Sequence, residues 1–565
     1  MNILQLPPEV LYTIVAGQSR KKLKVLRQVC RIFNQLVEPL LFSTITLTAM
    51  PTRNATLASF YNFLESLANG TTNAGAHVRS LSVNRLTPTP HELAEAVTEA
   101  KADGKDLKGS HDEKMKDWLL LALGSLKGVR SVSWILDRSD PPWMRPGIIQ
   151  YFANLPKLEE LYIKRDFEIL GDTRLGVISN LKKLRIEGIS ETIRGSLLDQ
   201  AVSIISNSPH LTSLSVSDID DDAGSREGDG LTFNSFFDRL PASSPPLRLT
   251  EVISQHIPLR LNAVALRHLK ELKSLKLEGN PDGEPDDVEG NEEEDWNMNW
   301  DEDEDEEEEE EEEDEEDRAA RLTWQPQPVL VGEIQNRRPK STAFWNKLQL
   351  SGIQLEKIDL EVVDHAALGY LSSYCGLRAL HFREIGASRA MLVNHIATMF
   401  YTEVLPKHVE TLEELTLVSS YVSAWSVDTQ NLELFSQCKN LKTLHVCWKP
   451  GAAGSVETFY SILDLSKTFP HLRSLSISFA YPRSIRGARC GNPYYSCQRV
   501  YRTKVKKIFP EYEHVDATKN LYKVKAGGLE FKLRPSEGSD SGYRYQFSPP
   551  KPGKKGFGGL GLGFG

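Results

Sequence analysis

A short apolar motif recurs along most of the chain. Leucine or another apolar residue takes the first, fourth and sixth places of the pattern LxxLxL, and the last two places alternate as in a strand with one buried face. The strong copies begin at Leu158, Leu181, Leu211, Leu272, Leu355, Leu377, Leu412, Leu441 and Leu472, and weaker copies begin at Val78, Val129 and Leu249. This recurrence predicts a repeat architecture in which neighbouring units share one core.

Apolar residues at helical spacing precede several copies of the motif, for example in residues 264–272, 434–441 and 465–472. One helix and one short strand per unit predict strands stacked side by side, with the helices covering one face. We expect the open face to bind a protein, and the alternating strand positions give these candidate residues: Tyr162, Lys164, Lys183, Arg185, Lys276, Lys357, Asp359, His381, Arg383, Glu414 and His445. Because both charge signs are mixed among them, no nucleic-acid partner is expected.

Residues 4–47 predict a separate helical module. Pro7 and Pro8 suit the first turn of a helix, Gly17 ends it, and Ser19 can cap a second helix. The second helix is expected to carry one apolar stripe made of Leu23, Leu26, Val29, Cys30 and Phe33. Since so short a segment buries little core by itself, its apolar surface is expected to meet a partner.

The same stretch resembles the F-box, a helical module that docks Skp-type adaptors in cullin ubiquitin ligases. The resemblance is carried by Leu6-Pro7-Pro8-Glu9, Ile14-Val15, Leu23 and Val29-Cys30-Arg31-Ile32-Phe33. Gln18 and Lys22 depart from the apolar and acidic residues usual in the family. The resemblance implies that an adaptor, and through it a cullin, binds Leu6, Pro7, Pro8, Leu11, Ile14, Val15, Leu23, Leu26, Val29, Cys30 and Phe33. The alternative is an ordinary helical hairpin that caps the following domain.

The chain as a whole is similar to F-box proteins with leucine-rich repeats, which are substrate receptors of Skp-cullin-F-box ligases. This similarity implies an α/β fold with an F-box-like module in residues 1–50 and an irregular leucine-rich-repeat solenoid in residues 51–480. It also implies a non-catalytic protein that acts by bringing a substrate close to the ligase. The alternative is a leucine-rich-repeat scaffold without ligase function, whose acidic loop binds basic proteins.

Charge divides the chain into two unlike parts. The sequence has 67 Lys plus Arg and 77 Asp plus Glu, a formal charge of −10, but residues 281–317 alone hold 26 acids and no Lys or Arg. Such a run repels itself and buries nothing, so residues 281–320 are predicted to be a disordered insertion within the solenoid. The insertion is either a solvated loop or a segment that captures basic surface, with Trp296, Met298 and Trp300 as anchors.

Beyond residue 480 the motif is not recognised, and residues 481–565 are predicted to be a basic, Gly-rich tail that is largely flexible. No enzyme motif is found, and neither a metal nor a cofactor is expected. His445, Cys447 and Cys438 lie near one another in sequence but do not make a full ligand set. Six scattered cysteines predict reduced thiols, and the absence of a signal or membrane-spanning segment predicts a cytoplasmic or nuclear protein.

Overall fold

One open sheet of sixteen strands runs through the chain in sequence order. The computed structural model describes residues 3–49, 57–89, 94, 111–137, 139–165, 174–188, 194–217, 232–278, 341–383, 390–451, 454–482, 492–512, 521, 523–535 and 543–549. The strands are β1 (Thr44–Leu47), β2 (Ser80–Val83), β3 (Ser131–Leu136), β4 (Glu160–Arg165), β5 (Lys183–Glu187), β6 (Ser213–Ser217), β7 (Glu251–Gln255), β8 (Ser274–Glu278), β9 (Lys357–Leu360), β10 (Ala379–Phe382), β11 (Glu414–Leu417), β12 (Thr443–Trp448), β13 (Ser474–Phe479), β14 (Lys523–Ala526), β15 (Leu529–Pro535) and β16 (Tyr543–Phe547).

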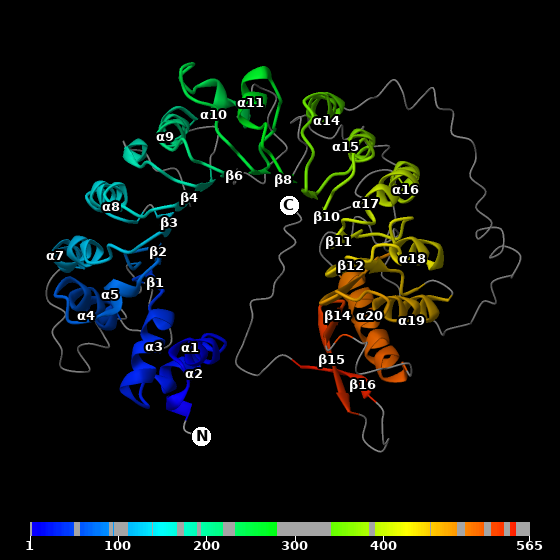
Figure 1. Cartoon of the computed structure of the whole chain (residues 1–565), viewed down its shortest axis with the longest axis horizontal. Helices are drawn as coiled ribbons and strands as arrows, with labels where there is room; N and C mark the ends of the chain where they lie inside the picture. Colours follow the sequence, from blue (N-terminus) through cyan, green and yellow to red (C-terminus); the bar gives the residue numbers. More distant parts are fainter. Residues whose placement is uncertain are drawn as a thin grey trace, which may run out of the picture.

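The strands lie on the inner side of an arc and most helices lie on its outer side (Figure 1). A helix is about 10 Å wide whereas strands are about 4.8 Å apart, so helices crowded on one face bend the sheet away from them. From the first repeat onward the helices are α4 (Leu57–Ala68), α5 (Ala74–His77), α7 (His111–Gly124), α8 (Met144–Ala153), η2 (Leu175–Val177), α9 (Arg194–Ser206), α10 (Asn234–Asp238), α11 (Ala263–His268), α14 (Ser341–Leu350), α15 (His365–Leu371), α16 (Ala390–Met399), the π-helix η4 (Phe400–Val404), α17 (Leu405–His408), α18 (Thr429–Phe435), α19 (Ser455–Ser466) and α20 (Asn492–Glu511).

Parallel pairing places the apolar positions of successive units in register. Leu161 of β4 lies beside Leu184 of β5, and Leu275 of β8 lies beside Ile358 of β9. The same rows run from β1 to β14 and face the helices, where their side chains are buried. All twelve strands predicted from the motif are confirmed, because burying one face fixes both the period and the register of each strand.

The acidic insertion does not interrupt the sheet. β8 and β9 are hydrogen-bonded neighbours, with Ser274 beside Lys357, although residues 279–340 separate the two strands in sequence. The predicted disorder of residues 281–320, with its anchors Trp296, Met298 and Trp300, concerns residues outside the described part of the chain. The insertion therefore leaves and re-enters the sheet between two adjacent strands.

The N-terminal module has three helices where the sequence predicts two. They are α1 (Pro8–Ala16), α2 (Arg20–Leu26) and α3 (Arg31–Leu41), preceded by η1 (Ile3–Gln5). The predicted continuous second helix is wrong: it stops after Leu26, and Cys30 is extended (φ −162°, ψ 169°) as the N-cap of α3. Ser19 does occupy the N-cap of α2, but its side chain makes no capping hydrogen bond.

The C-terminal region differs from the predicted flexible tail. α20 covers residues 492–511, β14 pairs in parallel with β13, and β15 and β16 add an antiparallel hairpin. Phe509 of α20 stacks on Phe531 of β15 with ring centroids 3.9 Å apart. The prediction of a largely flexible segment from 481 to 565 is therefore wrong for these elements, which are packed rather than free.

Candidate binding surfaces

The N-terminal module has a hydrophobic core separate from that of the sheet. Val15, Leu23, Phe33, Val37 and Leu41 form this core, and their side chains are at most 7% exposed. A second set of contacts centres on Arg27, whose Nε donates to Asn34 Oδ1 at 3.0 Å and whose guanidinium lies 3.4 Å from Glu38 and over the Phe42 ring. The module is thus held together by its own residues.

This small module also exposes many apolar side chains. Among the described residues, seventeen large apolar side chains are exposed, and seven of them belong to residues 3–32: Ile3, Val10, Tyr12, Ile14, Val25, Val29 and Ile32. Val25 and Val29 are the most exposed of the seven, at 62% and 61%. So many exposed apolar side chains on so small a unit make it a candidate binding site for another protein.

The structure divides the predicted adaptor-binding residues into three groups. Leu11, Val15, Leu23 and Phe33 are buried, and Leu6, Leu26 and Cys30 are half-buried. Pro7, Pro8, Ile14 and Val29 are exposed. Among the exposed apolar residues of α1 to α3, sequence reasoning missed Val10, Tyr12, Val25 and Ile32, because spacing alone does not show which apolar positions stay exposed.

Basic side chains are also exposed on the module. Arg20, Lys21, Lys22, Lys24 and Arg31 are exposed, and they lie on α2 and at the start of α3. Arg27–Glu38 is the one ion pair between described residues of the module. A partner with acidic residues around an apolar groove fits this surface best.

The predicted substrate-binding residues lie on the face of the sheet that is not covered by helices. Tyr162, Lys164, Lys183, Arg185, Lys276, Lys357, Asp359, His381, Glu414 and His445 alternate with the buried rows of β4 to β12, and Arg383 directly follows β10. None of them is among the buried residues of the described chain. We call this face the inner face, since it lines the inside of the arc in Figure 1.

Charges in the middle of the inner face are paired, either between neighbouring strands or along one strand. Lys183 Nζ lies 2.8 Å from Glu160, and Arg383 lies 2.5 Å from Asp359. Further pairs are Arg185 with Glu187, Lys276 with Glu278, and His381 with Glu414. Such exposed pairs contribute little to stability, so they chiefly cancel net charge on this surface.

Tyr162, Arg185 and Glu187 contact one another on this part of the face. The Arg185 guanidinium lies 5.0 Å from the centre of the Tyr162 ring, and the Tyr162 hydroxyl donates to Glu187. Burial and this hydrogen bond to a carboxylate both raise the pKa of Tyr162. The phenol is therefore neutral and offers a flat, ordered contact surface to a protein ligand.

His445 and Cys447 lie on the same side of β12, in the far part of the inner face, whereas Cys438 is buried in the core. Burial lowers the pKa of His445 to about 4, with His381 and Lys525 adding to the effect, and the ring shares a 2.7 Å hydrogen bond with Ser478. Cys447 is fully buried and donates to the Ser419 carbonyl, and burial raises its pKa to about 12. Within the described residues no three ligand-type side chains are grouped to hold a metal.

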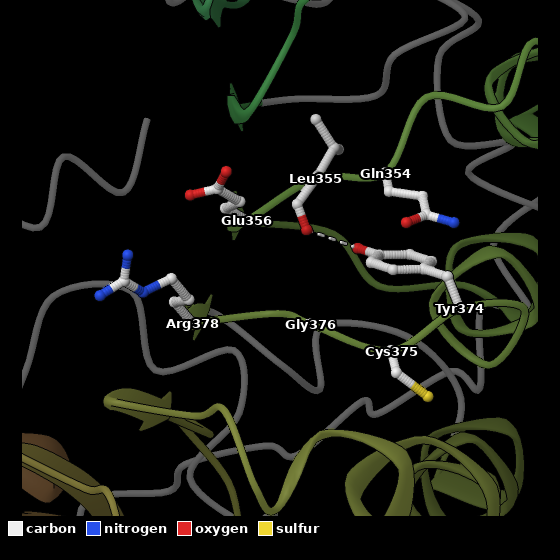
Figure 2. Close-up of a pocket in the computed structure, with 7 residues that line it drawn as sticks. All are labelled: Gln354, Leu355, Glu356, Tyr374, Cys375, Gly376 and Arg378. Atoms are coloured by element: carbon white, nitrogen blue, oxygen red, sulfur yellow. Dashed lines mark hydrogen bonds between the residues drawn. The ribbon is translucent and has the colours of Figure 1, made fainter.

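A small pocket of about 360 Å³ opens beside the starts of β9 and β10 (Figure 2). Its lining is Gln354, Leu355, Glu356, Tyr374, Cys375, Gly376 and Arg378. The Tyr374 hydroxyl donates to the Leu355 carbonyl at 3.0 Å, and the two charged residues are already paired, Glu356 with Lys273 and Arg378 with Glu413. The polar groups of the pocket thus hold the turns between repeats together.

No protein-family model matches the sequence, and no curated protein matches it significantly. None of the described helices is both long and apolar enough to cross a membrane. The candidate binding surfaces of the described residues are thus the exposed apolar residues of the N-terminal module and the inner face of the sheet.

Proposed function

We propose that this protein is the substrate-recognition subunit of a cullin-type ubiquitin ligase. In this proposal the N-terminal module docks a Skp-type adaptor and the inner face holds a protein substrate. The observation that carries the proposal is the module itself: it has its own core yet exposes seven large apolar side chains. A hairpin that only capped the sheet would turn such side chains inward.

The repeat units support the second half of the proposal. Each apolar motif contributes one strand to a sheet whose rows stay in register from β1 to β14, as in a leucine-rich-repeat solenoid. A solenoid offers a long inner face on which a protein is held by many small contacts. Ubiquitin transfer then needs only proximity, which raises the effective concentration of the substrate at the ligase.

The exposed members of the predicted docking set are assigned to adaptor contact. These are Pro7, Pro8, Ile14 and Val29, joined by Val10, Tyr12, Val25 and Ile32. The buried members, Leu11, Val15, Leu23 and Phe33, shape the module and contact the adaptor only indirectly. A docking test therefore has to change exposed positions, because a change at Leu11 lowers the stability of the module as well.

The test compares two double variants of the full chain. Ile14→Asp with Val29→Asp places two charges on the proposed contact surface, while Val264→Asp with Leu350→Asp makes the same change at exposed positions of α11 and α14. We expect the first variant to lose adaptor affinity by about a hundredfold, since two apolar contacts are replaced by buried charge. The control variant should bind like the wild type in isothermal titration calorimetry with a purified Skp-type adaptor.

A wild-type chain that binds no adaptor at all would contradict the proposal. In that case the alternative is a leucine-rich-repeat scaffold, whose acidic insertion binds basic proteins. The two functions are separated by copurification from cells: the ligase subunit brings down a stoichiometric adaptor, and the scaffold brings down basic proteins whose binding is lost when residues 292–317 are deleted.

A further inference from the structure

The last three strands extend the inner face beyond the repeats. Lys525 of β14 lies beside Ser476 of β13, and Glu530 of β15 lies opposite Lys525. On the other side of the same strands, Phe531 and Tyr545 are buried, 1% and 0% exposed. The polar side chains of β14 to β16 therefore share one face with the inner face of the repeats.

This end of the face is strongly basic. It carries five basic side chains, which we call the basic end face: Lys523, Lys525, Lys532, Arg534 and Arg544. Glu530 is the one acid on the same face of the three described strands, and both Lys523 (2.5 Å) and Lys532 (3.2 Å) pair with it. The carboxylate of Glu530 thus forms ion pairs with two of the five basic side chains.

The strand register brings like charges directly opposite one another. Lys523 faces Lys532 across β14 and β15, and Arg534 faces Arg544 across β15 and β16. Like charges in directly opposed positions destabilise a sheet. Neither arginine has an acidic partner among the described residues, and both are exposed.

The middle of the inner face is built in the opposite way. There Lys183 is paired with Glu160, Arg185 with Glu187, and Arg383 with Asp359. The same sheet therefore neutralises its charges where the repeats are regular and leaves them unbalanced at its C-terminal end. Nothing in the packing of β14 to β16 requires this excess of positive charge. An anionic ligand would neutralise it.

Three observations favour a peptide as that ligand. Alternate side chains on β15, such as Lys532 and Arg534, repeat every 6.8 Å or so, which is also the repeat of alternate side chains in an extended peptide. β16 is the last strand in the sheet order, so its outer edge can accept the backbone of an added strand. Tyr543, at 38%, is the one large exposed aromatic side chain of β14 to β16, whereas single-stranded nucleic acid needs a row of stacking rings.

We propose that the basic end face binds an extended acidic segment of a partner protein, with carboxylates at alternate positions contacting first Lys532 and then the opposed pair Arg534 and Arg544. Arginine pairs well with a carboxylate because its guanidinium donates two parallel hydrogen bonds. The proposal does not depend on adaptor docking, which uses the opposite end of the chain. If the protein is a ligase subunit, this face selects substrates that carry an acidic stretch.

The test uses two fluorescein-labelled peptides of equal composition and charge. One alternates glutamate and threonine over twelve residues, and the other has six glutamates followed by six threonines. Fluorescence anisotropy with the full-length protein should show that the alternating peptide binds at least about fivefold more tightly, because its carboxylates match the spacing on β15. The affinity for it should fall steeply as salt is raised from about 50 to 200 mM.

Variants locate the binding. Arg534→Glu with Arg544→Glu should weaken binding of the alternating peptide about tenfold or more, since two charge-assisted contacts become repulsive. Arg130→Glu with Lys157→Glu makes the same charge change at exposed positions far from the basic end face, and binding should be unchanged. Glu537→Gln with Asp540→Asn removes acids of the connection between β15 and β16, which lies outside the described residues, and should leave or raise the affinity.

Several results would overturn the proposal. Equal binding of both peptides means that the face attracts negative charge without regard to its spacing, and binding of neither peptide leaves the basic side chains only the role of keeping a strand edge from pairing. Tighter binding of a twelve-nucleotide single-stranded DNA assigns the face to nucleic acid. Binding seen only after deletion of residues 301–317 assigns it to the acidic run of the same chain rather than to a partner.

Discussion

The N-terminal module and the sheet bury apolar side chains in very different measure. The core of the module consists of five buried residues, whereas the core of the sheet is one continuous cluster that extends from β1 to β16. The module exposes seven large apolar side chains within its first 32 residues, and the inner face of the sheet is mostly polar. A unit with so small a core has little stability to spare, whereas the core of the sheet is large.

The largest expected effect on stability comes from removing a large aromatic side chain from one core or the other. Trp134→Ala removes a fully buried ring that packs edge-on against Phe152 at 5.5 Å, and it should lower the free energy of unfolding of the sheet by roughly 3–5 kcal/mol. Phe33→Ala should instead disrupt the module alone. All nine tryptophans lie outside residues 1–50, so a change in tryptophan fluorescence does not come from the module, and limited proteolysis with mass spectrometry reports the module.

The claim that the two cores are independent is wrong if the module and the sheet unfold together. Phe33→Ala would then shift the fluorescence transition as well as the cleavage rate within residues 1–50. An unshifted fluorescence transition together with faster cleavage confirms that the two cores are independent.

The strands β2 to β13 could be predicted from the sequence, whereas the strands at the two ends of the sheet could not. Leu161 and Ile163, like their counterparts in each repeat, have to be buried on one face, and that requirement fixes strand, face and register. β14 presents only Val524 and Ala526 to the core, side chains too small to resemble a leucine motif. Its place in the sheet is set by its parallel pairing with β13, which is distant in sequence.

The break between α2 and α3 could not be predicted from the sequence, for a different reason. The stripe from Leu23 and Leu26 to Cys30 and Phe33 keeps helical spacing across the break, so periodicity alone favours one helix. Periodicity also finds apolar positions without showing whether the chain itself or a partner covers them. Leu11 and Ile14 fit the same pattern, yet Leu11 is 2% exposed and Ile14 is 43% exposed.

A second prediction concerns a weak point within the otherwise stable sheet. Asp140 is 5% exposed and accepts hydrogen bonds from the backbone N–H groups of Leu86 (3.0 Å) and Thr87 (3.1 Å). Burial raises its pKa from 3.8 to about 6, and the nearby Asp137 adds to the rise. Because the folded state holds this proton more tightly than the unfolded state, the contribution of Asp140 to stability falls as the pH rises from about 4 to 6.

Asp140→Asn should remove that pH dependence. The amide oxygen still accepts from the two N–H groups, and no buried charge has to form, so the variant should gain up to about 3 kcal/mol relative to the wild type at pH 7. Urea unfolding followed by tryptophan fluorescence at pH 4 and pH 7 measures the difference. Equal stability changes at the two pH values would show that Asp140 does not titrate in this range.

The smallest expected effect on stability comes from the N-cap residues of two helices, one in the sheet region and one in the module. Asp428 caps α18 by accepting from Asn431 N–H at 3.0 Å, whereas Ser19 stands at the N-cap of α2 without a side-chain hydrogen bond. Asp428→Ala should therefore cost about 1 kcal/mol in urea unfolding of the sheet, and Ser19→Ala should leave the protease sensitivity of the module nearly unchanged. A marked effect of Ser19→Ala would mean that the cap forms in solution, and that local hydrogen bonds add to the small core in holding the module together.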